Sequence, residues 1–291
     1  MSLDLFDEVS TLWRYPFMRH ALVSGSAVAV MGAAVGWFVV LRREAYAAHS
    51  LAMVAFPGAT TAAYLGVAPV LGYFGMAVAG AGAIAALGPV AASGTYRGHS
   101  ANVGSVQALA LAVGLLFASL YEGSLANVTA FLFGSFLGIS ATEATALVIV
   151  AVAALAVLAL LGRPLLFASV EPAVAAGSGV PVRALNVAFL VLVGVAVAAA
   201  SQFTGVLLVF SVVVTPPAIA QAVTARPALS LGLSMAVSVS VVWAGLGAAF
   251  FTDRPAGFWI TTIGFGAYVV VRAVVGSLSV VRRRRVDRVS P

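Results

Sequence analysis

Long apolar runs dominate the sequence, and the run from Ala144 to Gly162 constrains the fold most because it contains no charged residue. As an α-helix rising about 1.5 Å per residue, such a run can cross the roughly 30 Å hydrocarbon core of a bilayer. Similar runs recur along the 291 residues, of which 62% are hydrophobic and 8% charged. That composition leaves too little polar surface for a soluble globule. The sequence therefore predicts an all-α, polytopic integral membrane protein.

The apolar runs also predict how the chain is divided. About nine of them can be recognised, which predicts eight or nine transmembrane helices. Residues 1–19 mix polar and aromatic side chains, which indicates an interfacial segment or a partly ordered tail. We assign residues 20–281 to a transmembrane domain and the arginine-rich residues 282–291 to a basic cytoplasmic tail. The stretch from Glu122 to Ile139 is short for a span, and it predicts a re-entrant or interfacial helix.

Two short patterns concern single helices. Ser140 and Glu143 form the S-x-x-E capping box that opens a helix. Gly32 and Gly36 have the GxxxG spacing that lets two helices approach closely. That spacing is also common by chance in a chain with 29 glycines. It therefore has little weight as a prediction.

The positive charge follows the expected membrane topology. A formal charge of +6 could suggest a nucleic-acid partner, but the arginines lie between apolar runs and near the C-terminal end. If the N-terminus is outside, most of them fall on the cytoplasmic side, as the positive-inside rule requires. These are Arg42, Arg43, Arg97, Arg163, Arg183, Arg226 and Arg282 to Arg285. We expect a multi-pass protein of the cytoplasmic membrane with lipids, and no nucleic acid, as partners.

Missing residue types exclude several kinds of chemistry. The chain contains neither cysteine nor lysine, which excludes disulfides, thiolate metal sites, a lysine base and a GxxxxGK[ST] phosphate loop. No HExxH or GxSxG motif is present, so we expect no enzyme activity and no bound cofactor. An ion-coupled secondary transporter would need titratable groups at mid-membrane, whereas the acidic residues are predicted in loops or near span ends. A membrane scaffold without transport is a further alternative.

His49 and Met53 are the first candidates for a functional site. They lie four residues apart in a predicted helix, so their side chains point the same way. A potential ligand pair inside lipid is unfavourable unless a bundle interior, a polar pathway or an ion receives it. The alternative is that Met53 is a packing residue and that a backbone carbonyl satisfies His49.

Two apolar runs contain proline beside small residues. Pro57 and Gly58 interrupt the first run, and Thr215, Pro216 and Pro217 interrupt the second. Because proline has no amide hydrogen, we expect a helix break at each place. Unwound backbone is tolerated at membrane depth only where protein or water satisfies it, so paired breaks indicate a translocation pathway. Proline kinks in purely structural spans are the alternative.

Residues 164–183, PLLFASVEPAVAAGSGVPVR, form the longest moderately polar insertion between spans. Arg163 and Arg183 place this insertion on the cytoplasmic side. A short alanine-rich helix between two turns at this position would suit docking of a soluble partner. An ordinary interhelical loop is the alternative.

Five segments resemble one transporter family. PFMRHALVSG, VVLRREAYAAHSLAMVAFPG and TGVLLVFSVVVTPPAIAQ are similar to segments of the membrane subunit of ATP-binding-cassette importers for zinc, manganese and iron. FLFGSFLGIS resembles that family's LFGDLL stretch, and SVEPAVAAGSGVP resembles its cytoplasmic SFDPEFAxxxGxP element. The similarity covers roughly residues 16–275 in the same order.

The resemblance implies an assembly in which this chain is one part. It implies a fold like that of type II ABC importers, two permease copies forming a homodimer, and two cytosolic ATPase subunits through which ATP acts. An extracytoplasmic metal-binding protein would deliver the transported ion. Residues 164–183 would contain the coupling helix that receives the ATPase, with Glu171, Pro172 and Gly177 at the matching positions.

The resemblance also locates a metal site, where this sequence departs from its relatives. The family's aspartate and histidine fall on His49 and Met53, and the aspartate of its LFGDLL stretch falls on Ser135. Imidazole suits zinc, copper and nickel, and thioether suits copper(I), whereas neither favours manganese. Zinc is therefore the expected cargo, and a diverged permease for another substrate is the alternative.

Overall fold

The computed structural model describes residues 15–87, 96–121, 139–206, 208–252 and 254–287, and every regular element in these ranges is an α-helix. This confirms the predicted all-α class. Residues 1–14 of the proposed interfacial segment lie outside the described residues, and so do nearly all of the proposed re-entrant stretch and Ser135. Those predictions therefore remain predictions.

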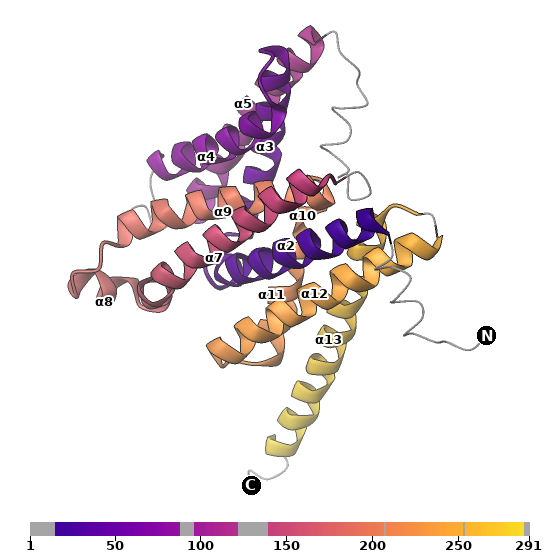
Figure 1. Cartoon of the computed structure of the whole chain (residues 1–291). Helices are drawn as coiled ribbons and strands as arrows, with labels where there is room; N and C mark the ends of the chain where they lie inside the picture. The colour runs from indigo at the N-terminus through magenta and orange to yellow at the C-terminus, as the bar shows by residue number, and fades with distance from the viewer. Residues whose placement is uncertain (1–14, 88–95, 122–138, 207, 253, 288–291) are drawn as a thin grey trace.

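Figure 1 labels the described helices in their order along the chain. They are α2 (Pro16–Leu41), α3 (Ala45–Tyr64), α4 (Pro69–Ala86), α5 (Tyr96–Leu120), α7 (Ala141–Val170), α8 (Pro172–Gly177), α9 (Val182–Thr204), α10 (Val209–Val213), α11 (Thr215–Val223), α12 (Pro227–Thr252) and α13 (Ala256–Asp287).

Among the described residues, seven helices are long and apolar enough to cross a membrane: α2, α4, α5, α7, α9, α12 and α13. The 20-residue α3 is long enough but less apolar, and α10 with α11 forms a shorter apolar pair from Val209 to Val223. A helix of lower hydropathy is stable in a membrane when other helices, rather than lipid, surround it. With α3 and the α10–α11 pair added to these seven helices, the total agrees with the eight or nine spans predicted.

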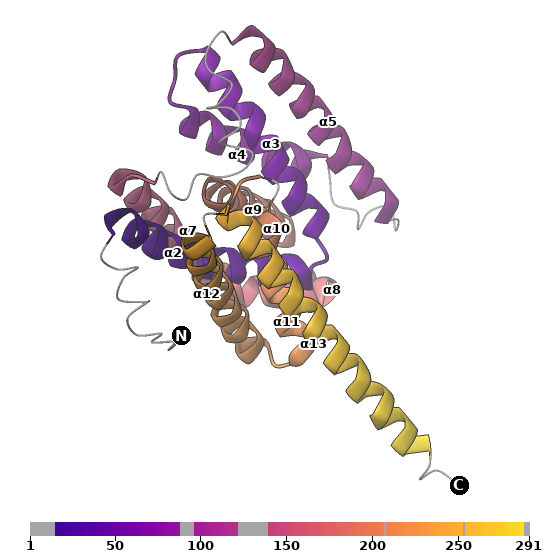
Figure 2. The same ribbon diagram turned by 90° about the vertical axis from the view of Figure 1, so that its right-hand side faces the viewer.

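Burial separates inner helices from outer ones. Within the most apolar 18-residue segment of each helix, the buried share is 72% in α2 and 67% in α9. The corresponding share is only 17% in α5 and 11% in α13. Figures 1 and 2 show α3, α4 and α5 grouped on one side of the α2 and α9 centre, with α12 and α13 on the other. The apolar outer faces are available to lipid or to another subunit.

Glycine allows the closest helix contacts at the centre. A Cβ atom at Gly36 of α2 would lie 1.7 Å from the carbonyl oxygen of Val213, so only glycine lets α10 reach this position. Gly32 lies against Val212 in the same contact. The GxxxG spacing, a weak signal in the sequence, is therefore the α2 surface on which α10 packs.

Tryptophan and serine side chains join α2 to α12. The indole N–H of buried Trp37 donates to the hydroxyl of Ser230 at 3.0 Å. Near the other end of these helices, the indole N–H of Trp243 donates to Ser26 at 2.8 Å. Because lipid offers no hydrogen-bond partner, these bonds fix the register of two otherwise apolar surfaces.

Several helix boundaries differ from those predicted. α2 begins at Pro16 instead of His20, because proline at the first helical position needs no amide partner. α7 begins at the predicted Ser140–Glu143 capping box, but it continues to Val170, into the 164–183 stretch that was predicted to lie between spans. α13 extends into the predicted basic tail as far as Asp287.

Candidate functional site

α3 carries the predicted ligand pair on a stripe that the described residues leave open. Within the fully described stretch from Tyr46 to Thr60, only Tyr46, His49 and Met53 are not buried. Spacings of three and four residues align these side chains on one face of the helix. The opposite surface of α3 packs against α4, α5 and α9. A stripe facing only lipid would be expected to be apolar, whereas this one carries an imidazole.

The His49 ring lies between α3 and the broken α10–α11 pair. Its ring packs edge-on against Phe210 of α10, with centroids 5.4 Å apart and an interplanar angle of 80°. Its Nδ1 atom is buried, and no described residue forms a hydrogen bond with it. A buried polar atom without a partner is rare because its desolvation is not compensated. The imidazole therefore has a nitrogen without a protein partner among the described residues, and a ligand can reach this buried atom only when a neighbouring side chain moves aside.

Met53 brings its thioether to the same stripe, and its backbone carbonyl lies in the helical turn before Pro57. Pro57 has no amide hydrogen, so the carbonyl of Met53 cannot accept the usual helical bond from the residue four positions later. The carbonyl of Pro57 itself accepts the hydroxyls of Thr60 and Thr61, at 2.9 Å and 2.8 Å. An imidazole, a thioether and a freed carbonyl thus occur within about two turns of α3.

The interruption expected at Pro57 and Gly58 does not end α3, which continues to Tyr64. Both residues instead create close packing. A Cβ at Gly58 would lie 2.0 Å from the Gly72 carbonyl of α4, and one at Gly114 of α5 would lie 2.7 Å from Pro57 Cβ. Neighbouring helices hold the backbone on both sides, so the missing hydrogen bond is tolerated without unwinding.

Ser50, next to His49 in sequence, joins α3 to α5. Its hydroxyl donates to the Gln107 side-chain oxygen at 2.7 Å, which supplies the partner that a glutamine inside a membrane requires. Ser50 itself is buried. This bond fixes the rotation of α3 about its axis beside the open stripe.

The second predicted interruption is a real break in the helix. Chain direction changes at Gly205, which has φ +85°, and α10 then ends at Val213 before α11 begins at Thr215. Pro216 and Pro217 occupy the first turn of α11, where amide donors are not needed. The Thr215 hydroxyl donates to the Phe210 carbonyl at 3.3 Å. Since the Phe210 ring touches His49, the two proline-containing segments meet.

The insertion between α7 and α9 forms a short surface helix, α8, which a single residue separates from α7 and a turn separates from α9. Glu171 precedes it, Pro172 begins it and Gly177 ends it, and all three are exposed. Ala175 is the buried residue of α8, and it packs against Ala168 and Leu185. The side facing away from the bundle is therefore free to meet another protein.

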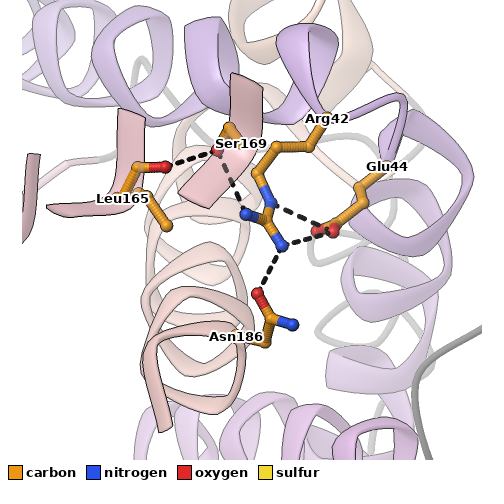
Figure 3. A network of polar contacts seen from close by, with 5 residues as sticks. All are labelled: Arg42, Glu44, Leu165, Ser169 and Asn186. Atoms are coloured by element: carbon orange, nitrogen blue, oxygen red, sulfur yellow. Dashed lines mark hydrogen bonds and ion pairs between the residues drawn. The ribbon is translucent and has the colours of Figure 1, made fainter. Parts of the chain in front are cut away.

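Arg42 links the start of α3 to the helices on either side of α8 (Figure 3). Its guanidinium contacts Glu44 Oε1 at 3.1 Å, Ser169 of α7 at 3.1 Å and Asn186 of α9 at 2.6 Å. It also lies 5.1 Å from the centre of the Phe189 ring. The end of α2, the start of α3, the end of α7 and the start of α9 therefore meet at one charged group.

Within the described residues, no three histidine, cysteine, aspartate or glutamate side chains come close enough to hold a metal ion.

Comparison with known proteins shows what kind of protein carries this arrangement. A family model described as ABC 3 transport family matches residues 14–275, most of the chain. The chain belongs to the ABC 3 transport family.

Relatives of this ABC 3 protein are transport subunits. It is 25% identical to the manganese transport system membrane protein MntC of Halalkalibacterium halodurans over 252 residues, covering 87% of this chain and 85% of that one. It is 24% identical to the high-affinity zinc uptake system membrane protein ZnuB of Haemophilus influenzae over 271 residues, covering 93% and 99%.

The fold matches a solved structure described as PsaBC from Streptococcus pneumoniae in complex with Fab. The TM-score is 0.81 at 20% identity, with coverage of 92% of this chain and 95% of that one.

The family model and the relatives show that the ABC 3 protein is a multi-pass subunit of the bacterial cytoplasmic membrane and not an enzyme with its own ATPase. The family implies separate ATPase and substrate-binding partners.

The structure also shows functional candidates that sequence reasoning missed. Phe210 and Ser50 flank His49 but carry no motif, and only their distance to α3 identifies them. Arg42 was counted as a topology charge together with Arg43. Nothing in the sequence distinguishes these two neighbours, yet Arg42 turns inward and Arg43 is exposed.

Proposed function

We propose that this ABC 3 permease conducts a transition-metal ion, with zinc as the preferred cargo, along the open stripe of α3. One observation carries this proposal: from Tyr46 to Thr60 the unburied positions form a single stripe, and it includes His49 with a buried, unpaired Nδ1. A permanently unpaired nitrogen is unfavourable, so a transient partner explains why the histidine is kept there.

The donor groups support the choice of ion. The stripe offers imidazole and thioether, and α3 contains no carboxylate. Imidazole nitrogen binds zinc well, whereas manganese prefers carboxylate, carbonyl and water. The named relatives include both a manganese and a zinc system, so the family alone leaves the metal open. The residues at His49 and Met53 favour the softer ion.

One copy of the chain supplies too few ligands for a complete site. Zinc commonly takes four ligands in a tetrahedron, and each α3 contributes one imidazole and one thioether. Two copies related by a two-fold axis would contribute two of each. We therefore propose a permease homodimer in which the two α3 stripes face a shared route.

The other parts of the proposed importer are assigned as follows. Residues 20–281 form the transmembrane domain, with a cytoplasmic ATPase docking on α8 through Glu171, Pro172 and Gly177. An extracytoplasmic metal-binding protein supplies the ion, and ATP acts only through the ATPase. Residues 1–19, whose last four residues begin α2, lie at the membrane interface, and residues 282–291, into which α13 continues, are a basic cytoplasmic tail. The break at Thr215, Pro216 and Pro217 is the part of the route that can change shape beside His49.

Metal binding to the purified dimer tests the ion and its ligands. Zinc, copper(I) and manganese are titrated separately into wild type and into His49→Ala and Met53→Leu variants. His20→Ala and Met76→Leu are matched controls, because both residues are half-buried as His49 and Met53 are. Zinc binding should weaken at least about tenfold, or about 1.4 kcal/mol, in the first pair only. Equal zinc binding by His49→Ala and wild type would refute the ligand assignment.

Copurification with the ATPase tests the docking surface. Gly177→Trp places a large side chain on α8, where no atom lies within 4 Å of a Cβ atom, so the permease itself should fold normally. Gly266→Trp makes the same change on α13, also in open space. We expect the first variant, and more weakly Glu171→Ala, to lose ATPase while the second retains it. Full retention by Gly177→Trp would mean that α8 is not the docking surface.

A further inference from the structure

The Arg42 side chain turns into the protein although it lies at the membrane boundary. Arginine at the end of a membrane helix ordinarily extends into water, as exposed Arg43 does. The Arg42 side chain retains only 11% of its exposure. In the described part of the chain, no hydrogen bond joins the Arg43 side chain to another residue, so the two neighbours form a natural comparison.

Each hydrogen-bond partner of Arg42 lies at or near the end of a helix. Glu44 is the residue that precedes α3, the helix of the open stripe. Ser169 lies in the last turn of α7, just before α8 begins. Asn186 lies in the second turn of α9, just after α8 ends. Both attachments of α8 to the bundle are therefore joined to the beginning of α3 through one guanidinium.

The contacts specify arginine rather than any cation. A guanidinium offers donors in a rigid planar fork, which can bond three acceptors while its face lies on an aromatic ring. Here the acceptors are Glu44, Ser169 and Asn186, and the ring is that of Phe189. The second carboxylate oxygen of Glu44 is buried without a partner, so Arg42 is the group that compensates its charge.

We propose that Arg42 is a positioning residue that transmits movement of α8 to α3. This inference rests on the proposed function, in which α8 receives the ATPase and α3 carries the ion. Apolar contacts between helices permit small sliding movements, whereas a charged, directional fork holds its partners in one register. When α7 and α9 shift with α8, the fork moves Glu44 and turns the stripe of α3 with it.

Coupled transport tests the inference. The permease and its ATPase are reconstituted into proteoliposomes, and zinc uptake and phosphate release are measured in the same samples. Arg42→Met should still assemble and hydrolyse ATP, but zinc moved per ATP should fall about tenfold, within the usual range of coupling effects. Arg43→Met, which removes the same charge, should match wild type. Arg42→Lys should be intermediate, because lysine keeps the ion pair but not the fork.

A second readout follows α3 directly. The chain has no cysteine, so Tyr46→Cys introduces one reporter thiol on the open stripe. Its rate of maleimide labelling should change with ATP in an otherwise wild-type complex and should not change in the Arg42→Met background. Ser169→Ala and Asn186→Ala each remove one link, and they decide the same question if Arg42→Met fails to assemble.

The outcomes separate this inference from the proposed function. An unchanged ratio of zinc to ATP, or unchanged ATP-dependent labelling, in Arg42→Met overturns the role of Arg42. If that variant does not assemble, unchanged values in both single-link variants do so. If the wild-type complex moves no zinc, the proposed cargo is wrong. Labelling of Tyr46→Cys that responds to ATP only when Arg42 is present would still support the inference in that case.

Discussion

Replacing His49 with phenylalanine should make the metal-free permease more stable and remove its stabilisation by zinc. The substitution keeps an aromatic ring at the position and deletes both nitrogens. The edge-on contact with Phe210, at 5.4 Å, is retained. The buried, unpaired Nδ1 is lost. If the imidazole serves the fold, this change should lower the stability of the metal-free permease. If it serves ligand binding, the change should raise that stability.

The magnitude follows from three contributions. Removing an unsatisfied buried nitrogen should stabilise the fold by about 1–3 kcal/mol. The ring contact, worth about 0.5–1.5 kcal/mol, stays in place. Fitting a slightly larger ring should cost less than about 1.5 kcal/mol, because the volume is nearly conserved. We expect a net gain of about 1 kcal/mol in the free energy of unfolding, from the difference between these contributions.

Thermal unfolding in lipid nanodiscs, followed by tryptophan fluorescence at one scan rate, measures both effects. Without zinc, the midpoint of His49→Phe should rise by about 2–4 °C per kcal/mol gained. With zinc at a hundred times its dissociation constant, wild type should gain about 2.7 kcal/mol, and the variant should gain far less. The variant should therefore be the more stable protein without metal and the less stable one with it.

His20→Phe provides the control, because His20 is a half-buried histidine outside the proposed site. It should leave the zinc effect unchanged. A His49→Phe protein that is less stable without metal would show that the imidazole has a structural partner. An unchanged zinc effect in that variant would show that the ion binds elsewhere. Either result would refute the role of His49 as a ligand held without a partner.

Two further predictions concern packing and are checked by the same thermal assay. Gly36→Ala should lower stability by about 1–3 kcal/mol or more, because its Cβ would lie 1.7 Å from a carbonyl oxygen of α10. Gly82→Ala, with no atom within 4 Å, should be nearly neutral, and an equal loss in both would exclude a specific contact. Ser230→Ala should lower stability by about 1–3 kcal/mol by leaving the buried Trp37 N–H unpaired. Ser240→Ala removes only an exposed bond within its own helix and should have little effect.

Local features of the sequence determined the class, the approximate spans and the surface helix. An uncharged run such as Ala144 to Gly162 must form a helix in lipid, because no other single segment satisfies its own backbone there. Arginines predict which span ends are cytoplasmic, and the S-x-x-E pattern at Ser140 marks a helix start. The pairing of His49 with Met53 on one face follows from helical spacing alone. None of these inferences needs a distant contact.

Only the tertiary structure decided which apolar surfaces face helices and which remain open. In a soluble protein, hydrophobic periodicity marks the core, but lipid tails are as apolar as leucine, so both faces of a membrane helix look alike in sequence. For this reason the sequence could not show that Gly36 receives α10, that Pro57 packs without ending α3, or that Arg42 turns inward. The position of Phe210 beside His49 likewise depends on how α10 folds back, which no local pattern encodes.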